Sequence, residues 1–424
     1  MATQVRTVEE LCAQAKEASR RLATLDAATK DAALRAIAHE LEARVDEILE
    51  ANAGDLEAGR AAGLTDALID RLTLDAERVQ AMADGVRTIV ELDDPVGEEL
   101  DARTLYNGLE LHKVRVPLGV VAIVYEARPN VTVDAAALAI KSGNAVVLRG
   151  SSTAERSNAA LAGIVAEAAE GAGLPEGSVA LIGGGDRAEL TELARQDRYV
   201  DLIIPRGCGA LKDALKDVAT VPVIYAAAGN CHVYVDVAAD VAMAKLIAYN
   251  AKVQRPGVCN SAETLLVHSD IAPQVLPGLM DKLREAGVEL RVDARARALV
   301  GTDGGDGLVA ATEEDWDTEY LGMTMAIKIV DSLDEAIDHI NNHGTGHSEA
   351  IVTGDKSAAD AFTGGVDAAC VYVNASTRFT DGGEFGMGAE MGNSTQKLHA
   401  RGPIGLRELC TFKYLVEGTG QIRP

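Results

Sequence analysis

Positive charge is in short supply along this chain of 424 residues. It has 40 lysines and arginines against 65 acidic residues, a formal net charge of −25. Nucleic-acid binding needs clustered Lys and Arg, and an anionic membrane surface attracts basic segments, so we expect neither as a partner. The acidic surface suits a high-salt cytosol and a merely acidic protein equally well, and it does not bear on the chemistry.

The chain also lacks the patterns of a secreted, membrane-spanning or zinc-binding protein. The N-terminal run MATQVRTVEELCAQAKEASR has no apolar signal-peptide core, and no stretch approaches the roughly 18 uncharged apolar residues of a membrane span. The six cysteines show no CxxC or Cys/His zinc spacing. We expect a cytoplasmic protein without a metal site, with one reactive thiol and the rest structural. The cysteines are Cys12, Cys208, Cys231, Cys259, Cys370 and Cys410.

The length favours two domains, because single hydrophobic cores stop growing at roughly 250–300 residues. The first 90 residues or so show apolar positions at three- and four-residue spacing, which predicts helices. The run DARTLYNGLELHKVRVPLG then alternates around Asn107–Gly108, a strong hairpin signal. A long hairpin with no core of its own is expected to project and to pair with another subunit.

Alternating strands and helices follow from Val120. The strands VVAIVYE, NAVVLRG, SVALIGGG and VDLIIPRG are each followed by a helix, which predicts a parallel sheet covered on both faces. Such sheets bind ligands beyond the carboxyl ends of their strands. A second α/β unit runs from about Cys231 to Gly383, with strands in AETLLVHS, MAIKIVDS, EAIVTGD and AACVYVN. The tail LCTFKYLVEG reads as one more strand, a candidate partner for the hairpin.

Cys259 stands out among the cysteines by its position. The helix VAMAKLIAYNAK ends by Pro256–Gly257, so Cys259 lies in a short loop before a strand. Loops held by rigid elements often carry nucleophiles. The alternative is burial as a small hydrophobe, the more common state of such a cysteine.

Asn130 follows a strand end and Pro129, at the mouth of the predicted sheet. Its amide could donate to a developing oxyanion. It could equally cap the helix that follows, and from spacing alone the cap is the better prediction.

Glycine-rich strand ends offer a third candidate site. The ends LRGSS and IIPRGCG flank the loop LIGGGD, and such turns accept phosphates where a helix begins. Gly183–Gly184–Gly185 matches neither the GxGxxG fingerprint nor a Walker A loop, so a plain strand-to-helix turn is the alternative.

The run HINNHGTGHSEAI places three histidines four residues apart. On an unbroken helix His339, His343 and His347 would share a face, as in a metal site. Gly344 and Gly346 interrupt the helix before His347, so a helix end followed by a turn is the better prediction.

Taken together, these segments resemble the γ-glutamyl phosphate reductase family, also called glutamate-5-semialdehyde dehydrogenase, of the aldehyde dehydrogenase superfamily. The resemblance spans roughly Pro117 to Pro403. The matching runs are PLGVVAIVYEARPNVTVD, GNAVVLRG, LIIPRG, CHVYVD, NAKVQRPGVCN, HINNHGTGHSEAI, VYVNASTRFTDGGEFGMGAE and STQKLHARGP.

The resemblance implies an α/β, aldehyde dehydrogenase-like fold with a Rossmann-type cofactor domain, an α/β catalytic domain and a β-hairpin oligomerisation arm. We expect residues 1–98 and 119–230 to form the cofactor-binding domain and 231–405 the catalytic domain. Residues 99–118 and 406–424 would form the arm, which implies a homo-oligomer, a dimer or a tetramer. A transient contact with glutamate 5-kinase is a further expectation.

The resemblance also assigns residues. Cys259 stands where the family has its nucleophile, and Asn130 matches the superfamily's oxyanion-hole asparagine, with the backbone N–H of Cys259 as second donor. Cys208 departs from the family, which usually has glycine there, and its side chain could crowd the cofactor. The residues implied for the cofactor are Arg149, Gly150, Ser151, Ser152, Gly183, Gly184, Arg206 and Gly207.

The implied reaction is the reduction of L-glutamyl 5-phosphate by NADPH to L-glutamate 5-semialdehyde, through a Cys259 thioester and with release of phosphate. Hydrolytic relatives place a glutamate before the cysteine to activate water. The aligned stretch here is AAGNCH, from residue 227 to 232, with no carboxylate. Its absence argues for exchange with phosphate rather than with water.

Two further expectations concern specificity. The loop Arg-Gly-Ser-Ser lacks the acidic residue with which NAD enzymes commonly bind the ribose hydroxyls, so we expect a preference for NADP. The substrate carboxylate needs a cation, for which Arg128 and Arg378 are candidates, each with an internal ion pair as the alternative.

Two rival functions stay open at this point. One is a hydrolytic, NAD-dependent aldehyde oxidation, against which the absent glutamate argues. The other is a binding or scaffold protein, for example a partner of the kinase, against which the retained Cys259 argues.

Overall fold

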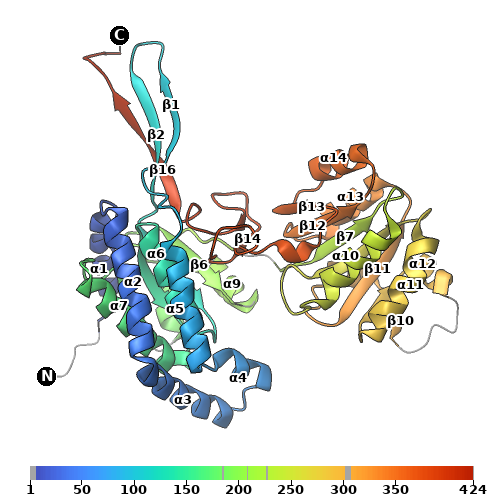
Figure 1. Cartoon of the computed structure of the whole chain (residues 1–424), viewed down its shortest axis with the longest axis horizontal. Helices are drawn as coiled ribbons and strands as arrows, with labels where there is room; N and C mark the ends of the chain where they lie inside the picture. Colours follow the sequence, from blue (N-terminus) through green and yellow to red (C-terminus); the bar gives the residue numbers. More distant parts are fainter. Residues whose placement is uncertain (1–5, 184–185, 208, 226–227, 301–306, 424) are drawn as a thin grey trace. The chain divides into compact units, whose positions relative to one another are not determined.

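The computed structural model describes residues 6–183, 186–207, 209–225, 228–300 and 307–423. The chain divides into two units, shown with the course of the chain in Figure 1. Unit 1 comprises residues 1–225, 386–392 and 404–424, and unit 2 comprises residues 226–385 and 393–403. No helix in the described ranges is long and apolar enough to cross a membrane.

Unit 1 opens with helices, as the apolar spacing predicts. Each of four begins at a polar residue whose side chain accepts a backbone N–H of the first turn, which satisfies donors that the helix itself cannot. These N-caps are Thr7, Asp26, Thr65 and Asp75. The helices are α1 (Val8–Leu22), α2 (Ala27–Ala43), α3 (Val45–Ala61), α4 (Asp66–Leu72) and α5 (Ala76–Val90).

A parallel sheet follows, with strand order β5-β4-β3-β6. Every residue of β3 and β4 is buried, as expected of strands covered on both faces. Its strands are β3 (Val120–Tyr125), β4 (Ala145–Arg149), β5 (Val179–Ile182) and β6 (Leu202–Arg206). The connecting helices are α6 (Asn130–Lys141), η1 (Ser152–Ala154), α7 (Glu155–Gly171) and α8 (Arg187–Leu193), and α9 (Gly209–Lys216) follows β6.

The predicted hairpin is confirmed as β1 (Glu99–Thr104) and β2 (Glu110–Pro117), with Gly108 at φ +79° in the turn. The predicted partner strand is confirmed as β16 (Cys410–Glu417), which pairs antiparallel with β2. Figure 1 shows these three strands as a ribbon extending beyond the helices of unit 1. We call this three-stranded sheet the arm.

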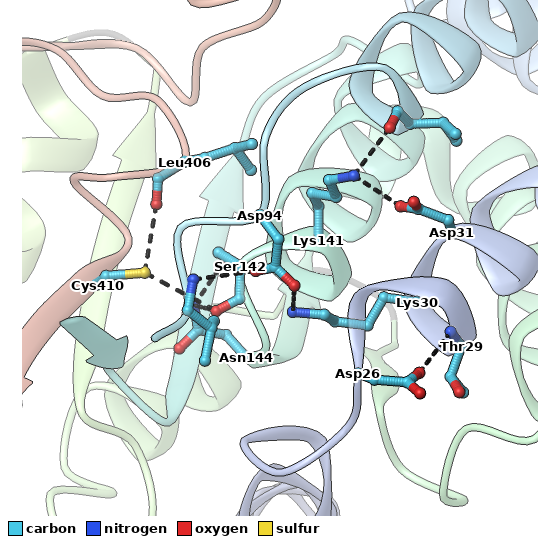
Figure 2. Close-up of polar contacts among 12 residues, drawn as sticks. Asp26, Thr29, Lys30, Asp31, Asp94, Lys141, Ser142, Asn144, Leu406 and Cys410 are labelled. Atoms are coloured by element: carbon cyan, nitrogen blue, oxygen red, sulfur yellow. Dashed lines mark hydrogen bonds and ion pairs between the residues drawn. The ribbon is translucent and has the colours of Figure 1, made fainter. Parts of the chain in front are cut away.

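Buried polar contacts hold the arm to the rest of unit 1 at the start of β16. The amide of Asn144 donates to the carbonyl oxygen of Leu409 at 2.8 Å, and the buried Cys410 thiol faces the carbonyl oxygens of Leu406 and Ser142 (Figure 2). Burial raises the pKa of Cys410 to about 12, so its thiol stays protonated. Cys410 is therefore a structural cysteine.

Unit 2 contains a seven-stranded parallel sheet of order β10-β9-β11-β8-β7-β12-β13. Val233 and Val235 belong to one apolar cluster and Tyr234 to another, so both faces of β7 are covered. The strands are β7 (Cys231–Val235), β8 (Ala262–His268), β9 (Glu289–Val292), β10 (Leu308–Ala310), β11 (Thr324–Val330), β12 (Ser348–Val352) and β13 (Cys370–Val373).

The helices of unit 2 are α10 (Val241–Val253), α11 (Ala272–Glu285), α12 (Ala294–Val300), η2 (Glu313–Asp317), α13 (Leu333–His343), α14 (Lys356–Gly365) and η3 (Thr377–Phe379). A small antiparallel pair, β14 (Asn393–Ser394) and β15 (Gly402–Pro403), follows. The expected continuous segment 231–405 needs a correction, because residues 386–392 and 404–405 belong to unit 1. There, backbone bonds of 2.7 Å join Ile404 to Met391 and Gly392.

Candidate active site

Cys259 lies in the loop between α10 and β8, as predicted. It is half-buried, whereas Cys12, Cys231, Cys370 and Cys410 are buried. Because β8 runs parallel to its neighbours β7 and β11, this loop lies at the amino ends of the strands. The general expectation of a ligand site at the carboxyl ends therefore does not apply to the cysteine of unit 2.

The main chain of Gly229 packs directly against that of Cys259. A Cβ atom at Gly229 would come within 1.6 Å of the carbonyl oxygen of Cys259 and 2.6 Å of its Cα. Such an overlap is impossible, so only glycine allows the two loops to approach. No side chain therefore fits at position 229.

Two carboxylates near this contact could not be found by local sequence reasoning. Glu319 accepts the backbone N–H of Gly229 at 2.6 Å. Glu263 pairs with Lys252 at 2.5 Å, and both side chains are fully buried. Burial raises the pKa of Glu263 to about 7, and burial lowers the pKa of Lys252. Each carboxylate thus already has a donor within unit 2.

The thiol of Cys231 binds the main chain of the Cys259 loop. The Cys231 Sγ–H donates to the carbonyl oxygen of Cys259 at 3.1 Å. Burial, with Glu349 nearby, raises the pKa of Cys231 well above its ordinary value, which keeps the thiol protonated as a donor. Cys231 therefore positions the loop, and Cys259 is the more accessible of the two sulfurs.

The ring of His347 lies beside Cys231 and Ser348. Its Nδ1 lies 3.9 Å from Cys231 Sγ and 2.8 Å from Ser348 Oγ, and burial lowers its pKa to about 4, so the ring is neutral. His339 and His343 share a face of α13, with ring centroids 4.5 Å apart. His347 instead follows Gly344, where the helix ends, as the glycines predict.

The other side of the loop is tied to η3, which carries Arg378. Asn260 donates to the carbonyl oxygen of Thr380 at 2.9 Å, and the Thr377 hydroxyl donates to that of Asn260 at 2.7 Å. The Arg378 Nε donates to Gln254 Oε1 at 2.9 Å. Burial lowers the pKa of Arg378, Arg255 adds to this, and Cys259 opposes it. The structure thus brings Arg378 within electrostatic reach of Cys259, held by an amide rather than by a carboxylate.

In unit 1, the predicted cofactor residues lie at the carboxyl ends of β4, β5 and β6. Arg149 ends β4 and is buried, and its Nη2 donates to the carbonyl oxygen of Asp186 at 3.0 Å. Within the described part of the chain, Arg149 Nε and Ser151 Oγ are buried without a hydrogen-bond partner. Two orphaned donors on one loop fit a ligand that carries phosphate or ribose oxygens.

Two glycines let these loops pack closely. A Cβ at Gly150 would lie 2.0 Å from Asn158 Nδ2, and one at Gly207 would lie 2.7 Å from the Cδ of Glu126. Gly183 follows β5 and would meet nothing within 4 Å, and Ser152 opens η1. The predicted Gly184 lies outside the described residues, as do Gly185 and Cys208.

Arg206 ends β6 and is partly exposed. It packs against the main chain of Gly392, where a Cβ would come within 2.3 Å of Arg206 Nη1. Arg128 is exposed on the loop between β3 and α6. The two candidate arginines for the substrate thus belong to different units, Arg128 with Asn130 and Arg378 with Cys259.

The helix-cap alternative for Asn130 is wrong. The N-cap of α6 is Pro129, and no side chain caps this helix. Asn130 is the first helical residue, is exposed, and donates from Nδ2 to Asp134 Oδ2 at 3.0 Å. The amide of Asn130 therefore does not bond the helix backbone, and it lies exposed just beyond the carboxyl end of β3.

Comparison with known proteins decides the family. A family model, the aldehyde dehydrogenase family, matches residues 1–298 and 309–414. The gamma-glutamyl phosphate reductase of Heliobacterium modesticaldum is 54% identical over 410 residues, 97% of each chain, and that of Thermobifida fusca is 51% identical over 418 residues, 99% of each. The crystal structure of the Thermotoga maritima gamma-glutamyl phosphate reductase is 46% identical, with a TM-score of 0.96 over 99% of this chain and 100% of that one.

The chain belongs to the γ-glutamyl phosphate reductase family. The comparisons confirm two predictions from the sequence: the family and the aldehyde dehydrogenase-like fold. An acetylating aldehyde dehydrogenase from Geobacillus thermoglucosidasius, 20% identical with a TM-score of 0.68 over 98% of this chain and 97% of that one, shares the fold alone.

Replacing Gly229 tests the contact that holds the Cys259 loop. We expect Gly229→Ala to lower the free energy of unfolding by about 3 kcal/mol or more, because the added methyl group would overlap the Cys259 backbone and force the two loops apart. Urea unfolding measures the change. Gly364→Ala in α14 is the control, since a Cβ there meets nothing within 4 Å. If both variants matched the parent, the contact would be absent in solution.

Proposed function

We propose that this protein reduces L-glutamyl 5-phosphate to L-glutamate 5-semialdehyde, releasing phosphate and using NADPH, the second step of proline biosynthesis. The observation that carries the proposal is the accessible Cys259 thiol on a loop fixed by Gly229, Cys231 and η3, with Arg378 in electrostatic reach. The names of the curated relatives support the substrate and its reduction.

The reaction begins at the thiolate of Cys259. Its sulfur forms a bond to the acyl carbon while the bond from that carbon to the phosphate oxygen breaks, and phosphate leaves with the electron pair. NADPH, when bound, supplies the hydride that converts the thioester to the aldehyde. Asn130 and the backbone N–H of Cys259 donate to the oxygen that carries negative charge, and Cys259 is regenerated as thiolate.

The surroundings of Cys259 support exchange of its thioester with phosphate rather than with water. A general base must reach a water molecule beside the thioester. The aligned stretch AAGNCH has no carboxylate, and Gly229 within it admits no side chain. Glu319 already accepts the Gly229 N–H, and Glu263 already pairs with Lys252. Because both carboxylates already bind donors, we expect the thioester to persist until hydride or phosphate reaches it.

The reverse reaction tests this chemistry. Oxidation of the semialdehyde with NADP⁺ should require inorganic phosphate, and Cys259→Ser should lower kcat by about 10³-fold or more. Absorbance of the reduced cofactor measures both. Cys370→Ser, which changes a buried thiol in β13, is the matched control and should keep activity. Phosphate-independent oxidation would instead favour the hydrolytic function, and an active Cys259→Ser variant would overturn the proposal.

The proposal includes NADPH as the cofactor, held in unit 1. The buried Arg149 Nε and Ser151 Oγ would hold the phosphorylated ribose, with Gly150 and Ser152 on the same loop. Gly183, Arg206 and Gly207 at the neighbouring strand ends complete the proposed site, together with Gly184, which lies outside the described residues. The 2′-phosphate would accept a hydrogen bond from Arg149 Nε, which has no acceptor in the described structure.

Cofactor preference tests this assignment. We expect kcat/KM to be higher with NADPH than with NADH, and we expect Arg149→Met to lower the NADPH value about tenfold or more, because one charge-assisted bond is lost. The NADH value should change little and serves as the internal control. Equal efficiencies with the two cofactors in the parent protein would refute the preference.

Arg378 is proposed to bind the substrate carboxylate. Arg378→Ala should raise KM about tenfold, the loss of about 1.4 kcal/mol of binding, without abolishing thioester formation on Cys259. Steady-state kinetics and trapping of the acyl-enzyme separate the two effects. Arg295→Ala, which removes an exposed ion pair with Asp331 in the same unit, is the control. An unchanged KM would leave Arg128 as the candidate.

The arm is proposed to join copies of this chain into a dimer or tetramer in the cytoplasm, with glutamate 5-kinase as a transient partner. Large apolar side chains of β16 are exposed, 46% for Phe412, 54% for Tyr414 and 51% for Val416. Alternate residues of a strand share a face, so these three form one apolar surface on the arm. Such a surface is typical of an interface.

Sedimentation of arm variants tests the oligomer. The double variant Tyr414→Asp, Val416→Asp should sediment as a monomer, because buried charges oppose association. Thr411→Asp with Lys413→Asp, on the opposite face of β16, is the matched control and should retain the parent's mass. If the Tyr414→Asp, Val416→Asp variant kept the parent's oligomeric state, the arm would not join the copies of the chain.

A further inference from the structure

Asp134 holds the side chain of Asn130 in one orientation. The two residues are one turn apart on α6, and Asn130 Nδ2 donates to Asp134 Oδ2 at 3.0 Å. Asn130 is exposed at the carboxyl end of β3, whereas Asp134 is half-buried beneath it. The contact is thus local to the first turn of the helix and independent of unit 2.

The chemistry of the two groups makes this bond directional. An ionised carboxylate only accepts hydrogen bonds, so it selects the nitrogen end of the amide and not the oxygen end. The amide nitrogen has two N–H groups, and Asp134 uses one. The second N–H stays available to a ligand. An asparagine without such a partner rotates broadly about its last torsion and can present its oxygen instead.

The charge of Asp134 is supported from the neighbouring strand. Burial raises its pKa to about 6, while the Asn130 bond and the charge of Arg206 at the end of β6 oppose this rise. Arg206 is itself held against the main chain of Gly392. At neutral pH the group is therefore mainly a carboxylate and an acceptor.

We propose that Asp134 is the positioning residue of oxyanion stabilisation. Its carboxylate holds the Asn130 amide in one of its two orientations, with one N–H bound to Asp134 and the second N–H left for the substrate oxygen. This role rests on the proposed function of Asn130 as oxyanion donor. The experiment is designed so that the two can fail separately.

Four variants in the phosphate-dependent oxidation assay test the role. Asn130→Ala should lower kcat by about 10²–10³-fold, the usual loss for an oxyanion donor. Asp134→Leu should lower kcat about tenfold or more with KM within about twofold, because the donor remains but is misaligned. Asp134→Asn should recover much of this loss, since its amide oxygen still accepts. The double variant Asn130→Ala, Asp134→Leu should be no slower than Asn130→Ala alone.

The control removes a carboxylate of α2 that pairs with the last residue of α6. Asp31 pairs with Lys141 at the opposite end of α6, with Nζ and Oδ1 2.6 Å apart (Figure 2). Asp31→Leu should lower the unfolding midpoint without changing kcat. This separates a loss of helix stability from a loss of amide orientation. Should Asp134→Leu fail to fold, Asp134→Ala removes the same acceptor without adding bulk.

Two results would overturn the role of Asp134 alone, given a slow Asn130→Ala variant. One is a normal kcat for Asp134→Leu and Asp134→Ala. The other is a loss that adds in full on the Asn130→Ala background, because a positioning residue has no effect once the group that it positions is gone. A normal kcat for Asn130→Ala would remove the donor function itself, and with it the role of Asp134.

Discussion

The contact between the main chains of Gly229 and Cys259 is the constraint on which the Cys259 loop depends. It fixes the distance between the start of β7 and the loop before β8, and it leaves no space for a side chain at Gly229. Cys231, two residues on, is thereby placed to donate to the Cys259 carbonyl. One backbone approach therefore sets the place of the Cys259 loop against the start of β7.

The two units contribute different chemistry. In unit 1, donors gather at the carboxyl ends of the parallel strands, where Asn130, Arg149 and Arg206 follow β3, β4 and β6. In unit 2, the thiol lies at the amino ends of the strands, on a loop fastened by buried hydrogen bonds. Buried polar groups that are fully paired, such as Glu263 and Lys252, make such a loop rigid.

Much of this could be predicted from local sequence. Apolar spacing marks the early helices, and Asn107–Gly108 marks the hairpin, because these signals depend on neighbouring residues. The motif around Cys259 identifies the family. The short strands β9 and β10 were missed, since a few apolar residues do not distinguish a strand from a loop.

Long-range contacts account for the rest. Spacing alone favours Asn130 as a helix cap, because it cannot show that Pro129 takes that position and that Asp134 binds the amide. Glu319 was missed because it lies 90 residues beyond Gly229, whose N–H it accepts. Residues 386–392 were assigned to the wrong unit because their pairing with Ile404 depends on the folded chain.

The most direct test of the central claim is to trap the acyl-enzyme. The protein is mixed with freshly made L-glutamyl 5-phosphate without reduced cofactor, digested and analysed by mass spectrometry. The account predicts a glutamyl adduct on the peptide that carries Cys259, which disappears when NADPH is added. An adduct on another residue, or turnover without any adduct on Cys259, would contradict it.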